Sequence, residues 1–599
     1  MTRAIRIGNA SGFYGDRFSA FQEMVDAGVD VVTGDYLAEL TMLILARQKA
    51  KDPEAGYART FLSQVRASLE ALVEKDIRVV ANAGGMNPEA LARAIRAAAD
   101  EAGLTVSVAH VDGDDLTDRA EELGLGSPLA ANAYLGGHGI TEALTRGARI
   151  VVTGRVTDAA IITGTAAWFH GWDRDDHDRL AGAMAAGHVI ECGAQATGGN
   201  FAFFTEIESL LHAGFPIAQI AEDGSCILTK PQGTGGAVTA ETVLSQLLYE
   251  VSGARYPGPD ATLRLDSLRL EDLGGDRVRM SGARGEAPPP DLKVSVTEIG
   301  GFRQEVTVLL TGLDPEAKAE LLRAQHADAL ERSGLPVPQS IEWTLARTDH
   351  PDAATQEEAT ARLTLVARDE NPTTVGRAFS NLLVEFALGS IPGFFSSSPP
   401  GEASVYGRFR PEFVPQTVPT HRVHVDGETL TIDPPLDTLP LEATDLDEHR
   451  PAPAASVTGA SASSGPEAGE TAAGTVTLPL GRLFGGRSGD KGGTANVGLW
   501  ARTDRTWAWL RDELTIDRLR QLLPEFADAA IDRVELPNLR AVNFVIHGAL
   551  GEGVAYGARF DPQAKGIAEW LRSRHITVPE ELAADTSLDG FFTEGGERA

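Results

Sequence analysis

The sequence predicts an α/β protein with a large N-terminal parallel-sheet domain, an α+β region, and a small C-terminal ferredoxin-like α+β domain. Two observations predict this fold. In residues 1–165, continuous apolar strands alternate with helical patterns, which is typical of a parallel sheet covered on both faces. In residues 475–599, two helical patterns alternate with strands that can form a small antiparallel sheet.

Five strands are expected in the N-terminal domain. They lie within residues 3–12, 29–39, 77–88, 104–115 and 148–160. The clearest helix between them is PEALARAIRAAADEAG, with Pro88 suited to its first turn and Gly103 to its end. These alternating elements define a first domain over residues 1–255.

Three further regions follow this domain. Residues 256–448 form the α+β region, in which strands such as LKVSVTEIG and ARLTLVARD alternate with the helix AKAELLRAQHADALE. Residues 449–474 are rich in Pro, Ala, Ser and Gly and are interpreted as a flexible linker. Residues 475–599 are the ferredoxin-like domain, whose first expected strand is TVTLPLGRLF.

Charge and composition exclude several classes of function. The net charge of −32 argues against a general nucleic-acid binder and against docking on anionic membranes. The sequence shows no signal-peptide core and no apolar run of membrane-spanning length. Cys192 and Cys226 are the only cysteines, so no disulfide framework is expected. A cytoplasmic protein without nucleic-acid or membrane partners is therefore predicted.

Each of the five strands ends in small and polar residues. Because ligands bind outside the carboxyl ends of parallel strands, we expect these residues to form one site. The alternative for each residue alone is a helix cap or a loop position. The strand-end residues are Asn9, Ser11, Gly34, Asp35, Glu39, Asn82, Gly84, Gly85, Asp112, Asp114, Asp115, Arg155 and Asp158.

The carboxylates of this set have two uses. They can hold Mg²⁺ together with water, or they can transfer protons. The alternative is a set of solvated loop carboxylates in a very acidic protein. No HExxH, EF-hand or CxxC pattern is present, so the sequence leaves the metal unknown.

Glycine-rich segments form the second group of candidates. They are ATGGN at 196–200, PQGTGG at 231–236 and FGGRSGDKGGTAN at 484–496. We expect the last segment to be a loop that clamps an anion through Arg487, Ser488, Asp490 and Lys491, with glycine N–H groups as further donors. Lys230 places another cation beside the glycine-rich segment at 231–236. The alternative is tight turns and a hairpin with solvated charges.

The segment HVIECGAQ offers a third candidate. If it is helical, His188 and Cys192 share a face, and a Cys–His nucleophile is conceivable. A free cysteine is more commonly a small buried apolar residue. Glu191 and Gln195 border the same segment and are candidates for hydrogen bonding to a substrate.

The motifs together resemble a known family. GNASGFYGDR, TGDYLAELTM, NAGGMNP, GRVTDAA, ECGAQATGGNF, TKPQGTGGAVT and RSGDKGGTANVG are similar to the acyclic terpene utilisation (AtuA-like) family. The first six resemble its large N-terminal region, and the last resembles its ferredoxin-fold domain. The resemblance implies a role in the catabolism of terpenes such as citronellol and geraniol, whose acids are degraded as coenzyme A thioesters. It carries over no catalytic residues.

We therefore expect a catabolic enzyme with lyase-, hydratase- or isomerase-like activity on an acyl thioester or a branched carboxylic acid. The alternative is a non-catalytic substrate-binding or scaffold subunit. The predicted acid–base residues are Asp35, Glu39, Asp115, Asp158 and Glu191. The predicted substrate-binding residues are Asn9, Ser11, Asn82, Arg155, Gly198, Gly199, Asn200, Lys230, Gly235, Arg487, Ser488, Asp490 and Lys491. The expected partner is a small molecule, and the sequence leaves the oligomeric state open, a homo-oligomer included.

Overall fold

The computed structural model describes residues 3–441 and 474–584. These residues form two compact units. Of the described residues, the first comprises 3–296, 410–441, 474–554 and 563–584, and the second comprises Thr297–Phe409 and Ala555–Pro562. The second unit thus begins later in the chain than the α+β region expected at 256–448. Apart from Gly474, the predicted linker at 449–474 lies outside the described residues.

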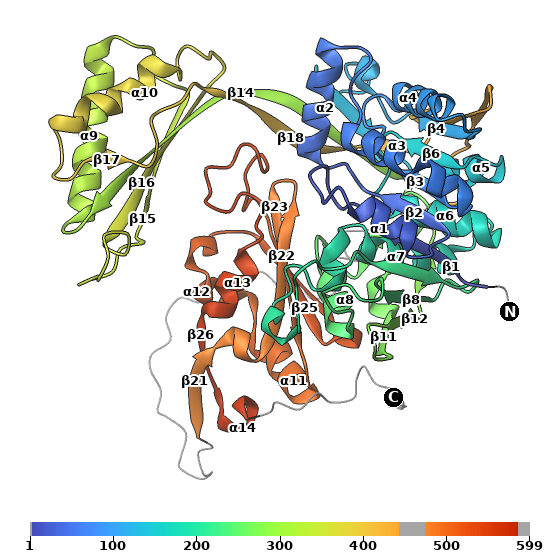
Figure 1. Cartoon of the computed structure of the whole chain (residues 1–599). Coiled ribbons are helices and arrows are strands. Elements are labelled where there is room, and N and C mark those ends of the chain that lie inside the picture. The colour runs from blue at the N-terminus through green and yellow to red at the C-terminus, as the bar shows by residue number, and fades with distance from the viewer. Residues whose placement is uncertain (1–2, 442–473, 585–599) are drawn as a thin grey trace. The chain divides into compact units, whose positions relative to one another are not determined.

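The first unit is built on an eleven-stranded sheet that contains all five predicted strands (Figure 1). Five central strands run parallel in the order β1 (Ile5–Asn9), β2 (Val31–Gly34), β3 (Arg78–Ala81), β6 (Ile150–Thr153) and β4 (Val108–Asp112). Each is an apolar run with buried side chains on both faces, as a covered parallel sheet requires.

Antiparallel strands extend both edges of this parallel core. Beyond β1 lie β7 (Ile217–Ile220), β8 (Cys226–Thr229), β12 (Val278–Ser281) and β11 (Arg269–Asp272), and beyond β4 lie β19 (Arg422–Val425) and β20 (Glu428–Thr431). The sequence did not predict these extensions, because β7 joins β1, β12 joins β8 and β19 joins β4 across long stretches of the chain. Further short strands are β5 (Ala130–Ala133), β9 (Arg255–Pro257), β10 (Thr262–Arg264) and β13 (Arg284–Glu286).

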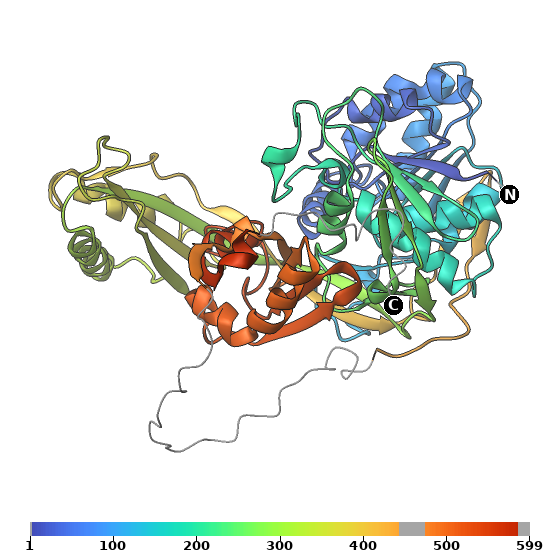
Figure 2. The same cartoon turned by 90° about the horizontal axis from the view of Figure 1, so that it is seen from below.

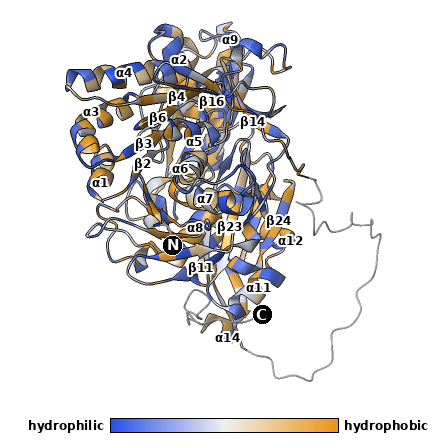
Figure 3. Cartoon of the chain, turned by 90° about the vertical axis from the view of Figure 1, so that its right-hand side faces the viewer, coloured by the Kyte–Doolittle hydropathy of each residue, from blue (hydrophilic) through white to orange (hydrophobic). Residues whose placement is uncertain are grey.

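Helices cover both faces of the sheet. The helices of the first unit's α/β part are α1 (Ala20–Asp26), α2 (Glu39–Lys51), α3 (Arg59–Glu74), α4 (Pro88–Glu101), α5 (His138–Thr145), α6 (Ala160–His170), α7 (His177–Ile190) and α8 (Ala240–Leu247). One core joins α1, α3 and α4 to side chains such as Val32 and Val79, and another joins α5, α6 and α7 to Val31 and Val80. Because side chains alternate between the two faces of a strand, adjacent residues such as Val31 and Val32 pack into different cores. Figure 3 shows the two-sided character of α4, which carries both hydrophobic and hydrophilic residues.

The C-terminal domain is ferredoxin-like (Figure 2, orange to red). Its four-stranded antiparallel sheet has the order β22 (Phe484–Lys491), β23 (Thr494–Ala501), β25 (Ala541–Ile546) and β24 (Ile531–Leu536). The remaining elements are α11 (Asp504–Glu513), α12 (Ile516–Leu522), α13 (Ile567–Ser573), α14 (Glu580–Ala583) and the ribbon of β21 (Thr475–Pro479) with β26 (His575–Pro579).

The second unit consists of helices on a sheet. Its elements are β14 (Asp291–Thr311), α9 (Pro315–Ser333), β15 (Ser340–Ala346), β16 (Thr360–Asp369), α10 (Arg377–Val384), β17 (Phe395–Ser396) and β18 (Ser404–Pro415), of which β14 and β18 begin or end in the first unit. Val306, Leu365 and Phe379 lie in its core. None of the described helices could span a membrane.

The expectation that FGGRSGDKGGTAN is a loop is wrong. Residues 484–491 form strand β22, paired along its length with β23, and only the turn after Lys491 is a loop. The glycines make room for aromatic rings. A Cβ atom on Gly485 would lie 2.1 Å from ring atoms of Trp500, and one on Gly489 would lie 2.3 Å from the ring of Tyr249. Of the glycines in this segment, Gly492 has a left-handed backbone, with φ +65°.

We predict that Gly485→Ala destabilises the protein by about 1–3 kcal/mol, the usual cost of overpacking a core. The new methyl group would overlap the buried Trp500 ring. Chemical unfolding monitored by tryptophan fluorescence would measure the change. Gly389→Ala is the matched control, because a Cβ atom there meets no heavy atom within 4 Å. Equal unfolding midpoints for both variants would contradict the packing argument.

Candidate functional site

The loops after β2, β3 and β6 bring several predicted site residues together. Asn82 Nδ2 donates a hydrogen bond to Asp35 Oδ1 at 2.6 Å, and Asn82 Oδ1 accepts one from Tyr36 N at 2.8 Å. Asn82 therefore ties the end of β3 to the loop that carries Asp35. From the end of β6, the buried Arg155 donates to Asp158 at 2.6 Å.

Asp35 is a buried carboxyl group with an altered proton affinity. Burial raises its pKa well above the ordinary value, and the nearby Asp158 raises it further. Arg155 and the hydrogen bond from Asn82 act in the opposite direction. Asp35 therefore holds its proton more tightly than an exposed carboxyl group does.

Glu39, at the first turn of α2, has a different environment. It accepts hydrogen bonds from Tyr134 Oη at 3.1 Å and from Lys293 Nζ at 3.5 Å. Burial alone would raise its pKa, but Lys293 and Arg155 outweigh burial and lower the pKa to about 2. Glu39 is therefore a permanently charged partner for cations and a poor base.

Tyr134 holds the cations of this region in place. Its ring lies 4.1 Å from the Arg155 guanidinium carbon and 4.7 Å from Lys293 Nζ, which are cation–π distances. Tyr134 and Lys293 were not among the residues predicted from the sequence. A lysine within the apolar strand pattern LKVSVTEIG was the signal that could have identified Lys293.

A second buried carboxyl group, Glu191, lies just after α7. Its Oε1 contacts His188 Nδ1 at 3.1 Å, while its Oε2 is buried without a hydrogen-bond partner in the described part of the chain. Burial raises its pKa well above the ordinary value, and Asp158 and Glu250 add to the effect. Asn9 positions this segment, because its Nδ2 donates to the carbonyl oxygens of Ile190 and Glu191.

Cys192 lacks the features of a nucleophile. Burial raises the pKa of its thiol well above the ordinary value, and Glu191 raises it further. The hydrogen bond described for His188 Nδ1 joins it to Glu191. The geometry thus favours a protonated thiol over the Cys–His nucleophile considered from the sequence.

The C-terminal domain brings two more cations to this region from β22. Arg487 Nη1 donates to the carbonyl oxygen of Asn200 at 3.3 Å, and Lys491 Nζ donates to that of Glu250 at 3.1 Å. Asn200 and Glu250 both have φ +58°. Such left-handed backbone in residues other than glycine is costly and is often associated with functional sites.

Arg487 is buried but only partly satisfied. Its guanidinium lies 4.4 Å from the centre of the Tyr249 ring, while Nε and Nη2 are buried without hydrogen-bond partners among the described residues. A buried guanidinium with free donors is suited to an anionic ligand.

Lys491 links the two domains electrostatically. Burial lowers its pKa to about 8, and Lys293 lowers it further, whereas Glu250, Glu191 and Glu39 raise it. Its side chain nevertheless keeps contact with solvent. Asp490 belongs to the same environment, because burial, Glu250 and Glu39 raise its pKa to about 7.

Other predicted residues have structural roles or lie apart. Lys230 Nζ forms an ion pair with Asp276 at 3.0 Å and donates a hydrogen bond to Thr234 O at 2.8 Å, so its charge is compensated within the protein. Asp115 is largely exposed, 3.9 Å from Lys49. Ser488 Oγ accepts a hydrogen bond from Ala568 N, and Ser11 Oγ donates one to Phe13 O.

The glycines of the large-domain loops serve close packing. A Cβ atom on Gly198, Gly199 or Gly235 would approach Ile207, Ala194 O or Leu211 O to within 2.8 Å or less. Gly198 also has a left-handed backbone, with φ +102°. These contacts account for the glycines without a ligand.

The sequence left open whether the strand-end carboxylates hold a metal ion or transfer protons. Among the described residues, one group of at least three His, Cys, Asp or Glu side chains has metal-binding proximity, and it consists of His110, Asp112 and His424. Asp112 thus belongs to a histidine pair at the β4 edge and not to the Asp35 region.

Two family models match the chain. Residues 5–425 match the model described as acyclic terpene utilisation family protein AtuA, and residues 478–577 match the AtuA ferredoxin-like domain. Comparison with curated proteins and with solved structures gave no match.

Asp114 provides a test of the electrostatics beside the site. Burial raises its pKa to about 7, although Arg155 N and Asn132 Nδ2 donate to its Oδ2. The folded state therefore binds this proton more tightly than the unfolded chain does. The resulting stabilisation is complete below the unfolded pKa of about 4 and is lost as the pH rises through about 7.

We predict that Asp114→Asn removes this pH dependence. The melting temperature of the variant, relative to the natural protein, should rise between about pH 4 and about pH 7. Thermal unfolding across this range measures it, with the exposed Asp118→Asn as the control. If the melting temperatures of the Asp114 variant and the natural protein differ by the same amount at every pH, Asp114 is not the source of the pH dependence.

Proposed function

Since the chain belongs to the acyclic terpene utilisation (AtuA) family, we propose that it is a catabolic enzyme acting on an acyl thioester or a branched carboxylic acid. The reaction would be lyase-, hydratase- or isomerase-like, with proton transfer next to the carbonyl group. The observation that carries the proposal is the pair of buried carboxyl groups, Asp35 and Glu191. Both are electrostatically coupled to Asp158 and Arg155.

The chemistry needs a base and a site for the developing negative charge. A carboxylate of Asp35 or Glu191 takes a proton from the carbon beside the carbonyl. The C–H electron pair then forms the enolate double bond, and the carbonyl π electrons move to oxygen. Arg155 supplies a positive charge for that oxygen, because its own pKa stays high: burial opposes its charge but Asp158 and Tyr134 favour it. A raised pKa makes either carboxylate a stronger base than an exposed carboxylate.

The cations of β22 suit the anionic part of the substrate. Arg487 Nε and Nη2 have no hydrogen-bond partner among the described residues. The charge of Lys491 interacts with those of Glu191 and Glu39. We assign these two residues to binding a carboxylate or a phosphate group of the substrate. Asp158 and Tyr134 act as positioning residues for Arg155.

Deuterium exchange tests the proposed proton transfer. We expect the protein to incorporate deuterium beside the carbonyl of a branched acyl-CoA in D₂O, measured by mass spectrometry over a panel of thioesters and their free acids. Asp35→Asn or Glu191→Gln should slow the exchange by about 10²-fold or more, the scale of general acid–base catalysis. The melting temperature should not fall, since carboxyls kept for chemistry are seldom kept for folding.

The exposed Asp118→Asn serves as the control and should exchange at the natural rate. Binding of a thioester without any exchange would replace the enzymatic proposal with a substrate-binding subunit. If no member of the panel is bound or altered, the proposed substrate class is wrong.

The protonation of Lys491 predicts how substrate affinity depends on pH. With its pKa lowered to about 8, Lys491 loses its positive charge as the pH rises from about 7 to about 9. The affinity for an anionic substrate should therefore fall over this range. Lys491→Arg should keep the affinity at high pH, whereas Lys491→Gln should weaken binding at low pH by about 1.5–3 kcal/mol.

Isothermal titration calorimetry with a non-reacting acyl-CoA measures these affinities. Thermal unfolding of both variants at each pH is the control for folding, because Lys491 Nζ also donates to the backbone oxygen of Glu250. If the affinity of Lys491→Arg falls with pH as much as that of the natural protein, another titrating group causes the effect.

A further inference from the structure

Three potential metal ligands meet where β4 pairs with β19 in the large sheet, outside the site described above. His110 and Asp112 are two residues apart on β4 and therefore face the same side of the sheet. Strand β19 runs antiparallel to β4, with His424 opposite His110. One potential ligand atom from each of the three side chains lies within 4.8 Å of the others.

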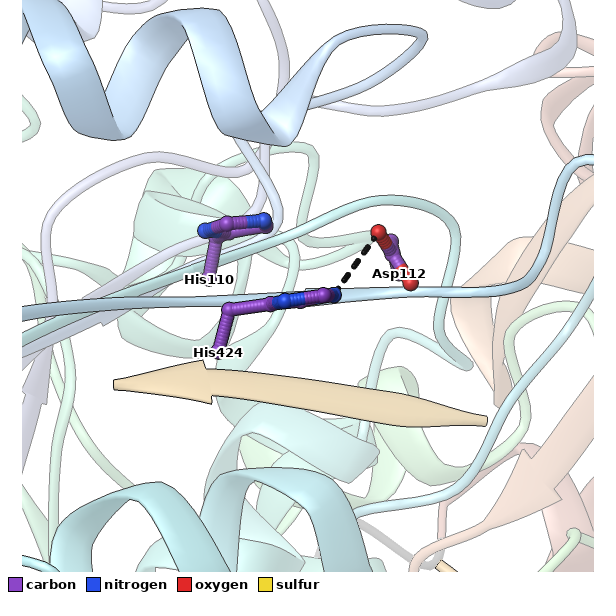
Figure 4. Close-up of side chains that lie close together, drawn as sticks. All are labelled: His110, Asp112 and His424. Carbon is purple, nitrogen blue, oxygen red and sulfur yellow. Dashed lines mark hydrogen bonds and ion pairs between the residues drawn. The ribbon is translucent and has the colours of Figure 1, made fainter. Parts of the chain in front are cut away.

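The side chains form a compact group (Figure 4). The two imidazole rings are stacked, with centroids 4.3 Å apart and 6° between their planes. His424 Nε2 lies 3.1 Å from Asp112 Oδ2, and Figure 4 shows Asp112 beside the ends of both rings. His110 is 7% exposed, and its Nδ1 has no hydrogen-bond partner among the described residues. A buried, unsatisfied polar side chain in such a group points to a missing ligand.

We propose that His110, Asp112 and His424 bind a divalent transition-metal ion, with Zn²⁺ as the best fit. Two imidazoles and one carboxylate are borderline ligands typical of zinc sites, and three protein ligands leave a fourth position for water. Asp112 and His424 are each about one quarter exposed, which gives solvent access to that position. Rotation about the soft χ2 torsions of the stacked rings brings one nitrogen of each toward a common ion.

Neighbouring groups already orient two of the three ligands. His424 Nδ1 lies 3.0 Å from Thr429 Oγ1, and Arg422 Nε donates to Asp112 Oδ1 at 2.8 Å. Such contacts fix the orientation of ligating histidines and carboxylates. The remaining oxygen of Asp112, Oδ2, is the one that faces His424.

The ion would fasten the β19–β20 ribbon to β4. Asp112 and Arg422 are 310 residues apart in the sequence, so a metal bridge here closes a very long loop. Because the complete ligand set exists only in the folded protein, metal binding and folding stability are linked. Loss of the proposed ion should therefore lower the stability of the folded protein.

The test uses the full-length protein, stripped of metal with a chelator and then titrated with Zn²⁺. We expect one saturable equivalent by calorimetry and a rise in melting temperature. Co²⁺ should give visible absorption bands of a nitrogen- and oxygen-coordinated ion. His424→Ala and Asp112→Asn should lose saturable binding, and Thr429→Val should weaken it by about 10- to 100-fold.

His575→Ala, at an exposed histidine on β26, is the control and should bind as the natural protein does. The proposal is overturned if the natural protein shows no zinc-dependent change in melting temperature and no saturable binding. Undiminished binding by Asp112→Asn and His424→Ala would also overturn it. Should His424→Ala fail to fold, Asp112→Asn alone decides the outcome.

Discussion

The structure of the candidate site depends on how the ferredoxin-like sheet docks on the segment that follows α8. Asn496 Nδ2 and Asn543 Nδ2 donate to the carbonyl oxygens of Leu248 and Val251, and Asn496 Oδ1 accepts from Glu250 N. These buried side chains satisfy backbone groups that the irregular segment leaves free. The small Gly489 and Gly498 let the sheet approach closely. Without this interface, Arg487 and Lys491 would have no fixed relation to the strand ends.

The same region concentrates buried charge, which proteins normally avoid. Arg155, Lys293 and Lys491 are set against Asp158, Glu39 and Glu250, so that the charges largely compensate one another. Buried ion pairs of this kind contribute little to folding stability, because the cost of removing the charges from water offsets much of their mutual attraction. It is better explained as a polar environment fixed in advance for a ligand. Burial disfavours the charged forms of Asp35 and Glu191, and the neighbouring Asp158 adds to the rise in both pKa values.

Local patterns predicted the centre of the fold well. The five parallel strands and the polar residues after them follow from apolar runs that end in Asp35, Asn82 or Arg155. Contacts between distant segments were not predictable. No local pattern pairs Lys293 with Glu39, or Arg487 with the backbone of Asn200. The segment at 484–491 was misjudged because glycine usually indicates a turn, whereas here Trp500 and Tyr249 occupy the space that side chains would need.

The late position of β19 in the chain has a consequence for protein synthesis. Strand β4 leaves the ribosome early, but its partner at Arg422–Val425 follows only after Thr297–Phe409, the larger segment of the second unit, has been translated. Throughout that interval the nascent chain carries an open β-edge, which can pair with another chain. His110 and Asp112 are the polar residues of that strand. Chaperone demand should therefore peak during translation of residues 113–421 and decline once the ribbon closes the sheet.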